Sequence, residues 1–311
     1  MRPSALRTRD LVIVTALAAA LLTGCANPQV SGSANTGAAE AVIPAVQKDD
    51  SLAALVPDKY KTAGEVRVAT NAPFPPYEMF TSPGSEELIG LEIDLGHAIG
   101  EKLGIPFKFS QQPFDGLITG LQADKYDLLM ATLFDTAERE QQLDFLNYAR
   151  SGSAIMVKSE NTEIATIDDL CGKTVAVQNG GTQAELAKSQ SRKCQAAGNA
   201  AVDVKGFPAF SDEQLALNSG GVTAILGDLP ALAYGATGNQ SLKILSDPAA
   251  PGGYDANYIG IGFSKDDDQL LEAVKGALTS LQKDGVYKQI FDKYGVPQST
   301  IEAPLTNQFG G

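Results

Sequence analysis

Tryptophan is absent from this sequence of 311 residues, which also contains only one histidine and three cysteines. Two cysteines and His97, far from them in the chain, do not make up the ligand set of an ordinary zinc site. The sequence also lacks a nucleophile paired with a histidine, although catalysis by carboxylates alone stays open. We therefore expect no metal, no cofactor and no catalytic residue.

Basic residues are in the minority, with 24 Lys and Arg against 37 Asp and Glu and a net charge of −13. Such a surface repels phosphate, so we expect no nucleic-acid partner. Hydrophobic residues make up 43% of the chain, enough for a sizeable core. The length favours two domains.

Long apolar runs are also missing, except at the N-terminus. Three arginines precede the apolar run 11–22, which is shorter than the roughly 20 residues needed to span a bilayer but suits a signal peptide. The run ends in Leu-Thr-Gly-Cys25, which resembles a bacterial lipobox. We predict a signal peptide over 1–24 and a lipid on Cys25 that anchors the protein to the outer face of the cytoplasmic membrane. The alternative is an ordinary signal peptide whose cleavage site adjoins a cysteine.

The other two cysteines, Cys171 and Cys194, form an even pair. An exported protein meets an oxidising compartment, which favours a disulfide over two buried free thiols. Closing a loop of about 24 residues would restrict the unfolded chain by roughly 3 kcal/mol.

The pattern after residue 60 predicts an α/β protein. Residues 25–60 are rich in small and polar residues, which predicts a flexible tether. Helical and strand-like segments then alternate, as in βαβ units with a mostly parallel sheet. The expected strands are 65–69, 106–109 and 126–133, and the expected helices are 95–103 and 117–121.

The same alternation restarts after residue 150. The expected strands are 173–177, 202–204, 222–226 and 258–263, and the expected helices are 180–193, 212–217 and the stretch 270–294. We therefore predict one lobe from 61–153 and 257–305, and a second from 154–256. Crossing strands would join them and leave a cleft at the carboxyl ends of the strands, where open sheets bind ligands.

Several separated motifs identify a family. Gly-Leu-Glu-Ile-Asp-Leu at 90–95 resembles a signature of the bacterial extracellular solute-binding proteins, family 3, as do the stretches 70–77, 135–139 and 180–183. The resemblance runs from about residue 66 to 294. It implies a periplasmic-binding-protein-like fold and a monomer that binds a polar amino acid and delivers it to the permease of an ABC importer.

Arg139 is the sharpest functional candidate. A guanidinium binds a carboxylate through two parallel hydrogen bonds, and the resemblance assigns the ligand α-carboxylate to Arg139. From the sequence alone, a surface ion pair with Glu138 or Glu140, worth at most about 1 kcal/mol, is equally good. The resemblance also implies ligand contacts from Ala131 and Thr132, within a segment that is longer than in the commonest members.

Three residues of the second lobe join this set. Thr182 follows Gly181 and begins a capping-box pattern that ends at Glu185, so it is either a helix cap or a carboxylate ligand, or both. Asp228 ends a predicted strand and suits an N-cap. The resemblance implies a carboxylate contact from Thr182, a ligand contact from Gly181 and an α-ammonium contact from Asp228.

Two aromatic residues and one amide complete the predicted site. By resemblance, Phe74 and Phe114 form flat walls around the ligand, although an isolated phenylalanine is more often core. Asn71 stands where relatives selective for cationic or amide side chains often carry Asp. This favours a neutral or acidic ligand side chain over Lys or Arg, unless Glu78 or Asp115 supplies the negative charge.

Two other functions share the predicted fold. One is an enzyme resembling cyclohexadienyl dehydratase, in which Asp228 or another carboxyl group of the cleft would transfer protons. The other is the ligand-sensing domain of a receptor. The transport receptor is the function that we favour.

The lipobox carries a direct prediction. Mass spectrometry of the protein extracted from membranes should show a diacylglyceryl adduct on Cys25. A soluble product cleaved before another residue would contradict it.

Overall fold

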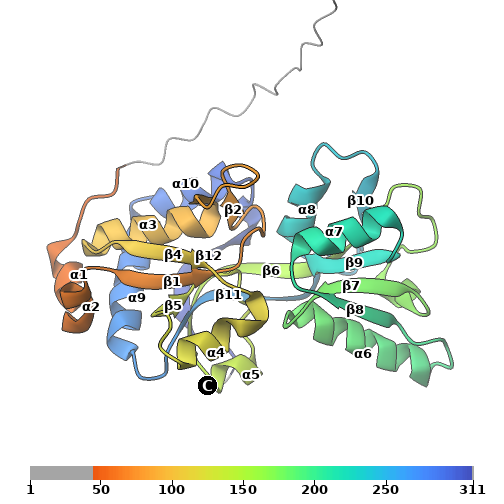
Figure 1. Ribbon diagram of the computed structural model, residues 1–311, viewed down its shortest axis with the longest axis horizontal. Helices are drawn as coiled ribbons and strands as arrows, with labels where there is room; N and C mark the ends of the chain where they lie inside the picture. Colours follow the sequence, from red (N-terminus) through yellow and green to blue (C-terminus); the bar gives the residue numbers. More distant parts are fainter. Residues whose placement is uncertain (1–44, 310–311) are drawn as a thin grey trace, which may run out of the picture. The chain divides into compact units, whose positions relative to one another are not determined.

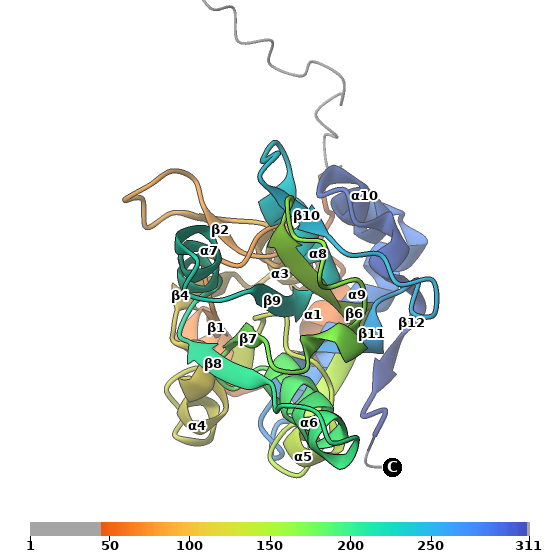
Figure 2. The ribbon, with the colours of Figure 1, turned by 90° about the vertical axis from the view of Figure 1, so that its right-hand side faces the viewer.

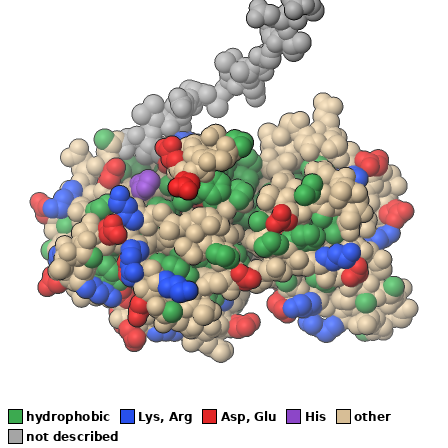
Figure 3. All heavy atoms as spheres, viewed as in Figure 1, with side chains coloured by type: hydrophobic (Ala, Val, Ile, Leu, Met, Phe, Trp, Pro, Cys, Tyr) green, Lys and Arg blue, Asp and Glu red, His purple; other side chains and the backbone are tan. Residues whose placement is uncertain are grey.

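The computed structural model describes residues 45–309 (Figure 1). The predicted signal peptide, Cys25 and most of the predicted tether lie outside the described residues. Among the described helices, none has the length and apolar character needed to cross a membrane. On the face drawn in Figure 3, acidic and basic side chains are interspersed over both lobes.

A ten-stranded sheet runs through the described region in the order β4-β1-β5-β11-β6-β9-β7-β8, with β10 and β12 also paired to β6. In the first lobe, β1 lies parallel between β4 and β5, and in the second lobe β7 lies parallel between β8 and β9. The strands are β1 Val66–Thr70, β4 Phe107–Gln111, β5 Leu128–Leu129, β6 Asp144–Lys158, β7 Thr174–Gln178, β8 Asp203–Phe207, β9 Ala224–Asp228, β10 Leu242–Ile244, β11 Tyr254–Phe263 and β12 Thr300–Thr306. A separate hairpin joins β2 Met79–Phe80 to β3 Leu88–Ile89.

The long strand β6 connects the lobes. Its first part pairs with β11, from Asp144 opposite Phe263 to Ser153 opposite Tyr254, and its later part pairs with β9. β11 returns antiparallel beside it, so the chain crosses between the lobes on neighbouring strands (Figure 2). The predicted fold of two α/β lobes joined by crossing strands is confirmed.

Helices cover both faces of the sheet in each lobe (Figure 1). In the first lobe, α3, α9 and α10 pack over one apolar cluster and α4 over another. In the second lobe, α6 covers one cluster and α7 and α8 the other. These helices are α3 Leu91–Leu103, α4 Leu117–Gln122, α5 Ala137–Glu140, α6 Thr182–Ala196, α7 Phe210–Ser219, α8 Leu229–Ala236, α9 Asp268–Lys283 and α10 Val286–Lys293, with short 3₁₀ turns at Phe114–Gly116, Ile167–Leu170 and Pro297–Ser299.

Part of the predicted tether is folded. Helices α1 Asp50–Leu55 and α2 Asp58–Ala63 begin the described region, and Tyr60 is buried with its hydroxyl donating to Asp267. Leu52 packs on the first-lobe core together with the buried Val56 and Tyr60. Leu52 belongs to α1 and Tyr60 to α2, and Val56 lies at the break between them, so these side chains reach the core from two short helices.

Two other predicted elements differ in extent. The helical stretch 270–294 is broken between α9 and α10, because Gly285 adopts a left-handed conformation with φ of 78°. The strand expected over 126–133 is reduced to Leu128–Leu129, and Thr132 beyond it has φ of 50°. Strands β2, β3, β10 and β12 were not predicted, and β6 was expected only as a crossing strand without assigned bounds.

Cys171 and Cys194 form a disulfide, as the sequence predicted. The bond ties the turn before β7 to the last turn of α6 in the second lobe. Cys194 is buried in the apolar cluster beneath α6.

Reduction of this disulfide should destabilise the protein. We expect the free energy of unfolding, measured by urea titration, to fall by roughly 3 kcal/mol because the unfolded chain regains the entropy of the loop. A Cys171→Ala/Cys194→Ala variant should be equally stable with and without reductant. An unchanged midpoint in protein whose two thiols have been shown to be free would contradict this account.

Candidate ligand-binding site

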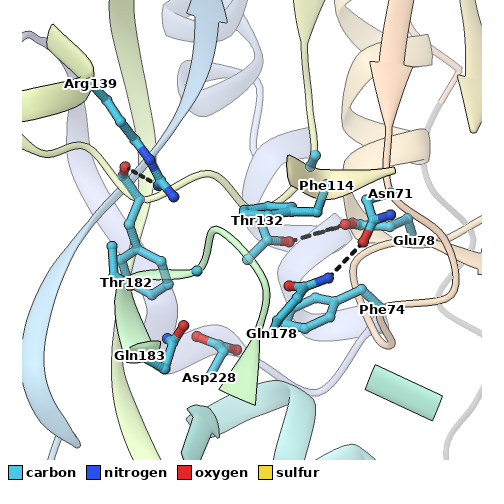
Figure 4. Close-up of a pocket in the computed structure, with 13 residues that line it drawn as sticks. Asn71, Phe74, Glu78, Phe114, Thr132, Arg139, Gln178, Thr182, Gln183 and Asp228 are labelled. Atoms are coloured by element: carbon cyan, nitrogen blue, oxygen red, sulfur yellow. Dashed lines mark hydrogen bonds between the residues drawn. The ribbon is translucent and has the colours of Figure 1, made fainter. Parts of the chain in front are cut away.

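A pocket lies where parallel strands of both lobes end. β1 leads to Asn71, β5 to Ala131, β7 ends at Gln178 and β9 ends at Asp228. The carboxyl ends of parallel strands meet at one edge of a sheet, which explains why residues so distant in sequence converge. The pocket is lined by Asn71, Phe74, Glu78, Phe114, Ala131, Thr132, Phe134, Arg139, Gln178, Gly181, Thr182, Gln183 and Asp228 (Figure 4).

Arg139 is held at the pocket by backbone groups of both lobes. Thr136 is the N-cap of α5, and its hydroxyl accepts a hydrogen bond from the backbone N–H of Arg139. The guanidinium donates to Phe134 O at 2.7 Å and to Gly180 O, in the second lobe, at 2.9 Å. Arg139 is only 9% exposed, so it is not the surface residue of the simpler interpretation. Burial lowers its pKa to about 10, which leaves it cationic at neutral pH.

Asp228 faces the pocket from the second lobe and is 2% exposed. It caps α8, since Oδ1 accepts Ala231 N–H at 3.1 Å, and Oδ2 accepts the Ser151 hydroxyl at 2.6 Å. Burial raises its pKa to about 7, against the opposing effect of these two hydrogen bonds. The structure therefore gives Asp228 both a capping role and a place in the pocket wall.

The predicted capping box at Thr182 is wrong. Helix α6 begins at Thr182 and its N-cap is Gly181, whose backbone is extended with φ of −74° and ψ of 152°. Thr182 is therefore the first helical residue, and no side chain caps this helix end. Both residues line the pocket, so the start of α6, where N–H groups lack partners within the helix, faces it.

The two phenylalanines differ in their surroundings. Phe74 packs on apolar clusters of both lobes and meets Phe210 of α7 edge to face at 5.8 Å. The Phe114 ring lies 5.7 Å from the Arg139 guanidinium carbon. Both rings are half-buried and line the pocket, as walls that aliphatic or cationic groups can contact.

Asn71 bridges the lobes. Its amide donates to Gln112 O at 2.8 Å, and its Oδ1 accepts the Gln178 side chain of the second lobe at 2.8 Å (Figure 4). The cavity left between the lining side chains has a volume of about 20 Å³, space for one water molecule. A ligand the size of an amino acid therefore has to displace contacts such as these, which requires the lobes to separate.

Thr132 and Ala131 also reach the pocket. The Thr132 backbone N–H donates to Glu92 at 2.8 Å and its hydroxyl to Glu78 at 3.4 Å. This N–H is therefore occupied by Glu92, a residue of the 90–95 signature that lies in the first turn of α3.

All the residues predicted to bind ligand therefore line one pocket, and four further residues line it with them. The sequence suggested Glu78 only as a source of negative charge, and it did not predict Phe134, Gln178 or Gln183 as site residues. Gln183 belongs to the motif at 180–183, and Gln178 ends a predicted strand in the same way as Asp228. Both residues could therefore have been recognised from the sequence as candidates for the pocket.

Two lobes that enclose a polar pocket between a buried guanidinium and a buried carboxyl group define a binding protein for a small polar solute. The family model of bacterial extracellular solute-binding proteins, family 3, matches residues 66–297. The chain belongs to this family.

Individual relatives agree with this assignment. The putative ABC transporter arginine-binding protein 2 of Escherichia coli K12 is 27% identical over 75% of this chain and 92% of its own length. Solved structures of an ancestral arginine-binding protein, bound to glutamine or to arginine, are 36% identical, cover 74% of this chain and 97% or 98% of their own, and have TM-scores of 0.67 and 0.66. The ancestral amino acid-binding protein AncCDT-1, a precursor of cyclohexadienyl dehydratase, is 29% identical over 76% of this chain and 98% of its own, with a TM-score of 0.67.

The raised pKa of Asp228 predicts a pH dependence of stability. The folded protein binds a proton here up to about pH 7, whereas the unfolded chain loses it near pH 4, so this contribution to stability is complete below about pH 4 and is lost progressively as the pH rises from about 4 to 7. Between pH 5 and 7, wild type should lose about 1 kcal/mol per pH unit relative to Asp228→Asn, measured by urea unfolding without ligand. The exposed Asp115→Asn should follow wild type, and parallel curves for wild type and Asp228→Asn would refute the assignment.

Proposed function

We propose that this protein is an extracytoplasmic receptor that captures a free amino acid and delivers it to the permease of an ABC importer. The observation that carries the proposal is the pairing of Arg139 from the first lobe with Asp228 from the second on the walls of one pocket. These two groups complement the carboxylate and the ammonium of a zwitterion.

The α-carboxylate would bind at Arg139 and at the start of α6. The guanidinium has five N–H donors, of which two are directed to Phe134 O and Gly180 O. The Thr182 hydroxyl and the N-terminal N–H groups of α6 add donors from the second lobe. A carboxylate between them would connect the lobes and favour closure.

The α-ammonium would bind at Asp228. An ammonium beside this carboxyl group favours its ionised form and offsets the cost of its burial. Phe74 and Phe114 would hold the ligand stem between them.

Glu78 changes the expectation for the ligand side chain. Asn71 favoured a neutral or acidic side chain, but Glu78 is fully buried and lines the same pocket, so it offers a carboxyl group that can ionise beside a ligand cation, which Asn71 cannot. The names of the relatives point the same way, since several are arginine-binding proteins and the ancestral one was solved with both arginine and glutamine. We therefore propose a ligand with a long basic or amide side chain.

The location and partners follow from the N-terminus and the family. Cys25 would carry the lipid that holds the receptor at the outer face of the cytoplasmic membrane, with the folded lobes acting as a monomer. The hinge strands β6 and β11 would permit the opening and closure that a permease distinguishes.

An enzymatic alternative has one relative in its favour, since AncCDT-1 is a precursor of cyclohexadienyl dehydratase. That relative is itself described as an amino acid-binding protein, and binding without reaction is our proposal for this chain. Ligand recovered chemically unchanged from the complex is the result we expect.

Replacement of Arg139 tests the proposal. A thermal-shift screen of the common amino acids identifies the ligand, and calorimetry then measures its affinity. Arg139→Ala should weaken binding by about 2–5 kcal/mol, or tens- to thousands-fold, because the ligand carboxylate loses its charged partner. Arg192→Ala, which removes an exposed guanidinium from α6, should leave affinity unchanged.

The comparison has a clear negative outcome. If folded Arg139→Ala binds the ligand as tightly as wild type, the carboxylate site lies elsewhere. Asp228→Ala should weaken binding to a similar extent, since it removes the partner of the ammonium at the opposite wall.

A further inference from the structure

Two carboxyl groups are buried together beside the pocket. Glu78 and Glu92 are both 0% exposed, and Glu78 lines the pocket whereas Glu92 lies behind it in α3. Burial and the neighbouring Glu92 raise the pKa of Glu78 well above its ordinary value, and burial raises the pKa of Glu92 to about 7. Ionisation of both carboxyl groups in a buried pair is energetically unfavourable, because the two negative charges repel each other away from water.

One carboxyl oxygen of the pair lacks a hydrogen-bond donor among the described residues. Glu92 Oε1 accepts both the Tyr148 hydroxyl and Thr132 N–H, while the Thr132 hydroxyl reaches Glu78 at 3.4 Å. Glu92 Oε2 is buried and has no donor among the described residues. A proton on one of the two carboxyl groups would supply such a donor, because a protonated carboxyl group donates a hydrogen bond and a carboxylate does not.

The groups that face the pair are acidic or neutral. They are Tyr77 of the same loop, Thr132 after β5, Tyr148 of β6 and, at longer range, Asp228 of β9. Arg139 lines the same pocket, but its guanidinium donates to backbone carbonyls of Phe134 and Gly180. Within residues 45–309, the hydrogen bonds to the two carboxyl groups come from the uncharged Thr132 and Tyr148, and neither carboxyl group takes part in an ion pair.

We propose that Glu78 and Glu92 share one proton beside the pocket, and that a ligand side chain of the guanidinium or ammonium class displaces this proton when it binds at Glu78. The O–H bond of the shared proton breaks, its electrons stay on the carboxylate oxygen, and the proton passes to water of the opened cleft. The cation then supplies the positive charge that the proton supplied before.

In this mechanism Glu92 acts through Glu78, because it influences the protonation state of the Glu78 carboxyl group. It does not touch the ligand, yet it determines whether Glu78 meets the ligand neutral or ionised. A neutral amide side chain can hydrogen-bond to the protonated pair and leaves the proton in place. The pair therefore sets the preference between cationic and neutral ligands according to pH. This inference rests on the proposed function, since Arg139 and Asp228 must hold the common α-amino acid end.

L-arginine and L-citrulline are the matched probes. They have nearly the same shape, but citrulline carries a neutral urea in place of the guanidinium. Calorimetry at pH 6.5, in buffers of different ionisation enthalpy, counts the protons released on binding. Any proton released at Asp228 by the ammonium is common to both probes, so the difference between them isolates the pair.

Wild type should release close to one more proton with arginine than with citrulline. Its dissociation constant for arginine should rise about tenfold per pH unit on acidification below pH 7, relative to that for citrulline. Glu92→Gln removes the acid that shares the proton, so both differences should become smaller, although burial still raises the pKa of Glu78; unchanged differences would contradict the shared proton. Glu78→Gln should abolish the preference for arginine, and Glu101→Gln on the exposed side of α3 should behave as wild type.

A second variant covers the case in which Glu92→Gln does not fold. Tyr148→Phe removes a hydroxyl that stabilises the ionised Glu92, so the pH at which arginine affinity falls should move upward. Equal proton release with both probes, or binding of citrulline but not arginine by wild type, would overturn the proposal while leaving the amino-acid receptor intact. If neither these probes nor any other amino acid binds, the proposed function itself fails and the shared-proton mechanism fails with it.

Discussion

The continuous pairing of β6 across both lobes is the constraint on which the pocket depends. This strand carries hydrogen bonds to β11 and β12 in the first lobe and to β9 in the second, so each lobe is anchored to the same backbone. Parallel strands of both lobes then end at a common place, and their last residues become the pocket wall. Because only neighbouring strands cross, small changes in their backbone angles can separate the walls without unfolding either lobe.

Burial of polar groups is energetically unfavourable, and in the pocket this penalty falls on a few residues. Arg139 loses part of its preference for the charged form, while Asp228 and Glu78 gain a preference for the neutral form. Groups held in this way have most to gain from a ligand of opposite charge. The closed contacts from Arg139 to Gly180 and from Gln178 to Asn71 show how the same donors are satisfied by the protein itself.

Much of the fold could be predicted from the sequence, because alternating strand and helix patterns are local. The residues at strand ends were also predictable, and all of the proposed ligand-binding residues line one pocket. The errors arise where tertiary contacts decide. Helices α1 and α2 gain their stability from packing, Gly285 divides a helical stretch, and strand β5 ends early. Gln178 stands at the end of a predicted strand, but its bond to Asn71 joins lobes whose approach no local pattern encodes.

Glu92 illustrates why a signature motif and a binding residue need not be separate categories. It belongs to the 90–95 signature at the start of α3, and its hydrogen bonds from Thr132 and Tyr148 tie α3 to the segment after β5 and to β6. The same geometry sets it behind Glu78, so that the framework of the first lobe controls the charge of the pocket wall. A change at Glu92 would then alter ligand preference without altering a single ligand contact, since the free energy of placing a second negative charge depends on the first.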